Sequence, residues 1–228
     1  MNTLESILES IQNVKVIDNS ISYDQYINID LSSTNPELSE LDLTNAANFE
    51  KYIENYLAKN KAQIAFGGYN EERNLYKRSA VFKSENCEER NIHIGLDLWI
   101  KAGTIILAAV DGVVHSFKNN TNLGDYGPTI ILEHQIENHV FYTLYGHLSL
   151  ESIPQIRRGD VFKKGQPIGS LGNSSVNGDY APHLHFQIIK DIKDNFGDYA
   201  GVCSPTNLNY YLQNCPDPNL LLKIKKSV

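Results

Sequence analysis

The sequence has 228 residues, of which 41% are hydrophobic and 21% are charged, with a formal net charge of −7. This size and composition are typical of a globular protein with one ordinary domain and an additional segment, and they indicate no particular oligomeric state. The negative charge argues against a nucleic acid or an anionic membrane as the main partner. No run of about 18 apolar residues is present, so no transmembrane helix is predicted.

The first 64 residues predict a small α/β appendage. Leu4, Ile7, Leu8 and Ile11 follow the spacing of an amphipathic helix, and Thr3 is suited to cap its N-terminus.

Three further elements are predicted in this appendage. A strand, expected at a sheet edge, passes through Ile27, Ile29 and Leu31. A helix is expected to start at Asn35-Pro36. A second amphipathic helix is expected from Thr44 or Asn45 to about Asn60. We expect the appendage to pack against the main domain, and regulation of access to a site is the alternative.

From about residue 65 to residue 228 the pattern predicts a second, larger domain of mainly β structure. Gly67-Gly68 marks a turn, and a polar stretch continues to Arg90. Short runs rich in Val, Ile, Phe and Tyr follow, at His93–Ile100, Thr104–Phe117, Thr129–His134, Val140–His147, Gln166–Leu171 and His183–Ile189. Such runs, separated by glycine turns, predict an antiparallel sandwich or barrel.

The C-terminal tail contains Pro205, Pro216 and Pro218 and predicts a loop with a short helix. The three cysteines, Cys87, Cys203 and Cys215, lack CxxC spacing. Free thiols are therefore favoured over a bridge between Cys203 and Cys215.

Two polar patterns lie on predicted strands. Side chains two apart share one face of a strand, so His183 and His185 point the same way, as do His93 and Asp97. Two imidazoles and a carboxylate suit zinc, and three protein ligands leave the fourth tetrahedral position for water. These residue types therefore predict a catalytic zinc site.

The same residues carry a resemblance that covers roughly residues 90–190. Five motifs in chain order resemble those of the lysostaphin/LytM-type zinc metallopeptidases. They are His93-Ile94-Gly95-Leu96-Asp97, Tyr145-Gly146-His147-Leu148-Ser149, Gly159-Asp160-Val161, Gly165–Gly169 and His183-Leu184-His185-Phe186. The resemblance implies a duplicated hybrid motif fold, one Zn²⁺ per chain, and His93, Asp97 and His185 as the metal ligands. It also implies His147 and His183 as catalytic histidines, with either one as the general base.

The remaining histidines are expected outside the site. His115 lies in an apolar pattern and is expected to be structural, and His139 is expected at a hairpin. His134 lies where members of the resembled family often have a histidine that is not a ligand. Two positions depart from the family pattern, Ala181, where glycine is frequent, and Gln187, where glutamate is frequent. The segment around Asn177-Gly178-Asp179-Tyr180 is bulkier than usual, which makes the substrate less certain than the chemistry.

The resemblance implies a zinc-dependent endopeptidase that cleaves peptide amide bonds in peptidoglycan cross-links or stem peptides. Two alternatives stay open, a cytoplasmic zinc hydrolase of a soluble peptide or amide and a non-catalytic regulatory module on the same scaffold. The N-terminus has neither the basic nor the apolar region of a secretory signal. As read, the chain is expected in the cytoplasm, or outside it if a leader is missing or export is unconventional.

Overall fold

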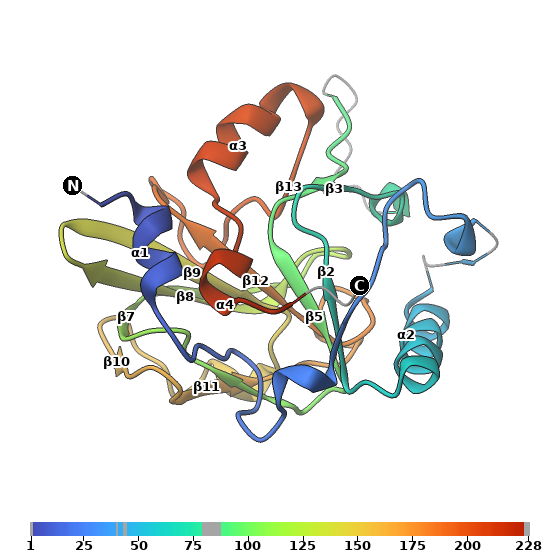
Figure 1. Cartoon of the computed structure of the whole chain (residues 1–228), viewed down its shortest axis with the longest axis horizontal. Coiled ribbons are helices and arrows are strands. Elements are labelled where there is room, and N and C mark those ends of the chain that lie inside the picture. The colour runs from blue at the N-terminus through green and yellow to red at the C-terminus, as the bar shows by residue number, and fades with distance from the viewer. Residues whose placement is uncertain (1, 40, 43–44, 79–87, 226–228) are drawn as a thin grey trace.

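The computed structural model describes residues 2–39, 41–42, 45–78 and 88–225. Eight strands form the central sheet: β1 (Tyr26–Asn28), β2 (Ile64–Gly67), β5 (Leu96–Trp99), β7 (Gly112–Asn120), β8 (Gly127–Ile136), β9 (His139–Gly146), β10 (Val161–Phe162) and β12 (His183–Ile189). Their order is β1-β2-β5-β12-β9-β8-β7-β10 (Figure 1). Only the β1–β2 pair is parallel, and all other pairs are antiparallel.

Two small sheets complete the β structure. One pairs β6 (Ile105–Leu107) with β11 (Pro167–Ser170), and the other contains β3 (Glu71–Glu72), β4 (Ile92–His93) and β13 (Val202–Cys203). The predicted mainly β, antiparallel fold class is confirmed.

The helices are few and short. They are α1 (Leu4–Ser10), α2 (Ala46–Asn60), α3 (Leu208–Asn214) and α4 (Asn219–Leu222). The Thr3 side chain caps α1, as the sequence predicts, and Asn35 caps a 3-10 helix at Pro36–Leu38. The Asn45 side chain caps α2. Within the described ranges, no helix is long and apolar enough to cross a membrane.

Alternation along β12 separates a core from a polar face. Leu184, Phe186 and Ile188 lie in the main hydrophobic cluster, together with residues of β6 and β11. His183 and His185 point to the opposite side of the sheet, where Ile189 joins a second cluster with residues of β4 and β13. The site therefore lies between the large sheet and the three-stranded sheet.

The structure refines several predicted elements. The run Thr104–Phe117 is two strands of different sheets, because the chain turns at Asp111-Gly112, and the run His93–Ile100 is interrupted between β4 and β5. The strand predicted through Leu31 is shorter, ends at Asn28 and is an edge strand. The tail has two short helices rather than one, α3 and α4.

Two of the three cysteines can be placed. Cys203 and Cys215 are buried free thiols, as predicted, and Cys87 lies outside the described residues. The division at residue 64 stays a prediction. Strand β1 from the first segment joins the central sheet through its pairing with β2.

Buried His134 on β8 gives the protein a pH-dependent stability. Its Nδ1–H donates to the carbonyl of Asp111 at 2.8 Å, and Nε2 lies 2.6 Å from the Thr143 hydroxyl. Burial lowers the pKa of His134 from 6.5 to about 4. Between these two values the unfolded chain binds the proton and the folded chain does not, so stability falls as the pH drops through this window.

When the pH is lowered from about 7 to about 5, protonation of His134 in the unfolded chain is expected to reduce the free energy of unfolding by about 2 kcal/mol. Urea unfolding of the protein and of His134→Gln at both pH values checks this. The variant should be less stable at pH 7 but should lose less stability on acidification. Equal losses in both proteins would contradict the assignment.

Candidate metal centre

Strand register brings the predicted ligands together. In the antiparallel pair of β5 and β12, His185 lies directly opposite Asp97. His93 ends β4, and the chain passes through Ile94 and Gly95 before β5 begins. Gly95 is required here, because a Cβ at this position would lie 2.4 Å from Cε1 of His185. The glycine thus lets the His185 ring reach the side chains of His93 and Asp97.

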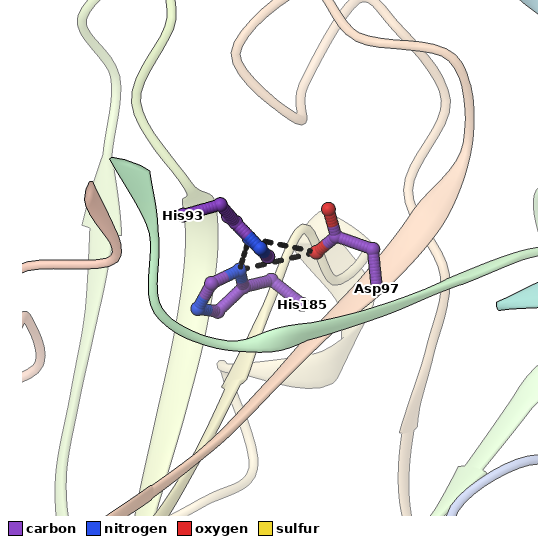
Figure 2. A group of neighbouring side chains, drawn as sticks. All are labelled: His93, Asp97 and His185. Atoms are coloured by element: carbon purple, nitrogen blue, oxygen red, sulfur yellow. Dashed lines mark hydrogen bonds and ion pairs between the residues drawn. The ribbon is translucent and has the colours of Figure 1, made fainter. Parts of the chain in front are cut away.

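The three side chains converge on one point, as Figure 2 shows. Nε2 of His93 lies 2.9 Å from Nδ1 of His185, and Oδ1 of Asp97 lies 3.3 Å and 3.2 Å from these two nitrogens. All three residues are 2% exposed. A tetrahedral zinc with bonds of about 2.0–2.1 Å separates its ligand atoms by about 3.3–3.4 Å. The two sides of the triangle that end at Asp97 are close to this separation, and the side between the imidazoles, at 2.9 Å, is shorter.

The hydrogen bonds of the two imidazoles fix which nitrogen carries the proton. Nδ1 of His93 is 2.9 Å from the carbonyl of Gly68, which can only accept, so Nδ1 must donate. Nε2 of His185 is 2.9 Å from Oε1 of Gln187, whose amide nitrogen donates to the carbonyl of Ala200. The other nitrogen of each ring, Nε2 of His93 and Nδ1 of His185, therefore faces the second imidazole and Asp97.

This donor set fits a cation. Three possible ligand atoms lie 2.9–3.3 Å apart, and the other nitrogen of each imidazole is hydrogen-bonded outside this triangle. Burial lowers the pKa of His93 to about 4, so its ring is neutral near pH 7. Burial raises the pKa of Asp97, but the neighbouring His93 and Arg73 outweigh it and hold that pKa well below its ordinary value. A carboxylate and two neutral imidazoles are zinc ligands.

The two predicted catalytic histidines lie beside this triangle. The rings of His147 and His183 are 4.2 Å apart, and Nε2 of His183 is 3.9 Å from Oδ1 of Asp97. Nδ1 of His147 donates to the carbonyl of Asn177 at 2.8 Å, and Nδ1 of His183 donates to that of Ala181 at 2.7 Å. In both neutral rings Nε2 can therefore accept a proton.

The site opens into a cavity of about 290 Å³ that all five predicted site residues line. Aromatic rings form much of its wall: Trp99 stacks on His183 at 5.6 Å, and Tyr126 contacts His147 and His185 at 5.5 Å and 5.0 Å. Burial, followed by the neighbouring histidines, holds the pKa of His147 well below its ordinary value, and burial also lowers that of His183. Both histidines are thus neutral and available as bases near pH 7.

Three other histidines lie outside this cluster, as the sequence predicts. His115 contacts Tyr142 and Phe196, and His134 is buried. His139 opens β9 after a turn, and its Nε2 lies 2.9 Å from the carbonyl of Asn2. Tyr145, two residues before His147, is fully buried in the core.

Two functional neighbours were not predicted. Gln187 orients His185, and its position two residues further on the same strand face could have indicated this role. Arg73 donates from Nη1 to Oδ2 of Asp97 at 2.6 Å. Arg73 lies in a stretch whose sequence shows only a polar connection, so no local signal marks it.

A buried carboxylate and four histidines around one cavity are residue types that are typical of metal-dependent hydrolases. Comparison with known families agrees, because residues 91–196 match the model of peptidase family M23. This part of the chain is therefore similar to peptidase family M23. The match contains every predicted site residue and excludes Arg73.

Relatives share this segment over a limited part of their length. The peptidoglycan DD-endopeptidase ShyA of Vibrio cholerae is 33% identical over 98 residues, which are 42% of this chain and 20% of that protein. Stage II sporulation protein Q of Bacillus subtilis is 26% identical over 168 residues, 74% of this chain and 51% of that protein. The catalytic domain of lysostaphin from Staphylococcus simulans is 25% identical, with a TM-score of 0.35, over 52% of this chain and 79% of that one. The chain spans about a fifth of the length of the first relatives that it matches.

Proposed function

We propose that this chain is a zinc-dependent endopeptidase that hydrolyses peptide amide bonds in peptidoglycan cross-links or stem peptides. His93, Asp97 and His185 would hold one Zn²⁺ per chain. The observation that carries the proposal is the triangle of Nε2 of His93, Nδ1 of His185 and Oδ1 of Asp97, in which the other nitrogen of each imidazole is hydrogen-bonded outside the triangle. The peptidoglycan substrate is supported by the names of two relatives, ShyA and ShyC, which are peptidoglycan DD-endopeptidases.

In the proposed reaction, the metal and the two histidines have different roles. Zinc, when bound, supplies a water with a pKa near 7 and polarises the scissile carbonyl. One of His147 and His183 takes a proton from the attacking water and returns a proton to the leaving amine. The other, once its Nε2 is protonated, would donate to the oxygen on which negative charge develops. The buried cavity limits the water around these groups, which strengthens their electrostatic effect.

The test begins with metal content and continues with two substrates. The protein is loaded with zinc near pH 7, dialysed, and its metal is measured; one zinc per chain is expected. It is then incubated with purified peptidoglycan and, separately, with short soluble peptides. New muropeptides that disappear after chelation and return with zinc would support the proposal. A protein that stays metal-free in excess zinc would contradict it.

The two alternatives give different results in the same experiment. Turnover of soluble peptides without release from peptidoglycan would favour a hydrolase of soluble substrates. Zinc binding without any turnover would favour a regulatory module, an alternative that the longer alignment with the sporulation protein makes worth testing. The compartment in which the protein works stays a prediction from the sequence.

A further inference from the structure

Arg73 is a buried cation next to the proposed metal site and outside the segment that matches the family. It is 2% exposed and follows β3, which pairs with β4 so that Glu71 lies opposite His93. Nε of Arg73 donates to Oε1 of Glu71 and Nη1 donates to Oδ2 of Asp97, both at 2.6 Å. Its guanidinium carbon also lies 5.5 Å from the ring centre of Trp99. Glu71, Asp97 and Trp99 therefore surround one fixed charge.

The two oxygens of Asp97 have separate partners. Oδ1 faces the nitrogens of His93 and His185, and Oδ2 is bonded to Arg73. Figure 2 shows one carboxylate oxygen joined to the two imidazoles and the other turned away from them. A carboxylate whose second oxygen is bonded in this way can offer only one oxygen to an ion between the imidazoles. The hydrogen bond is charge-assisted and short, which makes it among the stronger kinds in proteins.

Stability does not explain why an arginine occupies this position. Nη2 of Arg73 is buried without a hydrogen-bond partner among the described residues. A buried ion pair is frequently no more stable than well-packed apolar side chains of similar volume. Burying a guanidinium that lacks one of its hydrogen bonds lowers the stability of the folded protein, so packing alone does not account for Arg73.

The backbone around Gly68 is shaped to admit this guanidinium. A Cβ on Gly68 would lie 1.9 Å from Nη2 of Arg73, and the residue has a φ of +102°, which glycine adopts readily. The carbonyl of Gly68 also accepts the hydrogen bond from His93. One turn therefore orients the imidazole of one proposed ligand and makes room for the cation that holds another.

The charges around Arg73 leave the carboxylate available to a metal. Glu71 forms an ion pair with Arg73 and is 14% exposed, and its Oε2 also accepts from the backbone N–H of Leu31. The charges of Glu71 and Arg73 offset each other, so the negative charge of Asp97 is not cancelled within the cluster. Arg73 can then fix the direction of Asp97 without removing the net attraction of the site for a cation.

We propose that Arg73 is a positioning residue that keeps Asp97 bound to the metal through Oδ1 alone, so that the fourth position stays open for water and substrate. The inference rests on the proposed zinc site. Without Arg73, Oδ2 is released and can bind the same ion, which raises the coordination number. The open position is then lost even though the metal stays bound.

Cobalt(II) is the probe for this inference, because four-coordinate Co²⁺ absorbs visible light more strongly than five- or six-coordinate Co²⁺. The protein, Arg73→Met and Arg73→Lys are each loaded with Co²⁺ alone, and the bound metal and visible spectrum are measured. Arg73→Met should bind one Co²⁺ per chain with clearly weaker absorption. Its peptidase activity should fall about 10–100-fold, the usual loss when a group that orients a ligand is removed.

Arg73→Lys is the conservative control. Its ammonium can still donate to Oδ2 but lacks the planar fork that also reaches Glu71, so the spectrum should return toward that of the unmodified protein. If Arg73→Met does not fold, Arg73→Gln, which is uncharged, takes its place. An unchanged spectrum in a folded variant, or loss of its metal, would overturn the inference. Failure of the unmodified protein to bind Co²⁺ or Zn²⁺ would instead overturn the proposed function.

Discussion

Replacing His185 with alanine is expected to remove both zinc and peptidase activity. His185 contributes one corner of the acceptor triangle and lies directly opposite Asp97 in the sheet. Two remaining ligands cannot complete a site that needs three protein groups and a water. Because a bound metal supplies several kcal/mol of transition-state stabilisation, activity should fall at least about 10³-fold.

Thermal unfolding gives a second measurement of the same change. A metal that binds only the folded state raises the melting temperature. Excess zinc should therefore raise the melting temperature of the unmodified protein and have no such effect on His185→Ala. Zinc content after dialysis should fall from one per chain to background.

Two control substitutions separate loss of the ligand from loss of a histidine. His139→Ala removes a histidine at the start of β9, away from the cavity, and should leave zinc content and activity unchanged. His134→Gln removes a buried histidine of the core and should lower stability while zinc content is retained. A His185→Ala protein that keeps zinc and activity would show that the triangle is not the metal site.

The β alternation was sufficient to place most of the proposed site. His183 and His185 share the polar face of β12, and Leu184 and Phe186 share its core face, as expected for strand residues two apart. Gln187 follows the same rule. Its role was not predicted because sequence alone does not show what a side chain on that face will contact.

The rest of the site depends on tertiary structure. His93 and Asp97 lie on strands of two different sheets, so their convergence depends on the bend at Gly95 as well as on alternation. His147 has a φ of +62° directly after β9, a backbone conformation that the strand pattern does not predict. Arg73 reaches Asp97 only because β3 pairs with β4, and a two-residue strand has too little sequence pattern to be recognised.

Replacing His147 with alanine is expected to reduce turnover while leaving zinc bound. His147 is buried beside the triangle, but it does not belong to the group of residues that could hold the ion. Its Nδ1–H donates to the carbonyl of Asn177, which leaves Nε2 unprotonated and able to accept or, once protonated, to donate. Loss of a general acid–base group reduces rate about 10²–10⁴-fold, so kcat should fall by that factor while zinc content stays at one per chain.

The pH dependence of kcat/KM should distinguish the roles of the two proposed catalytic histidines, His147 and His183. Burial and the neighbouring histidines hold the pKa of His147 well below its ordinary value, and burial lowers that of His183. A lowered pKa keeps the neutral base present at lower pH, so the acid limb of the profile should lie below the ordinary histidine value of about 6.5. If His147 is the base, His147→Ala loses this limb and His183→Ala keeps it in its residual activity. The reverse pattern assigns the base to His183, and unchanged kcat in His147→Ala would exclude His147 from catalysis.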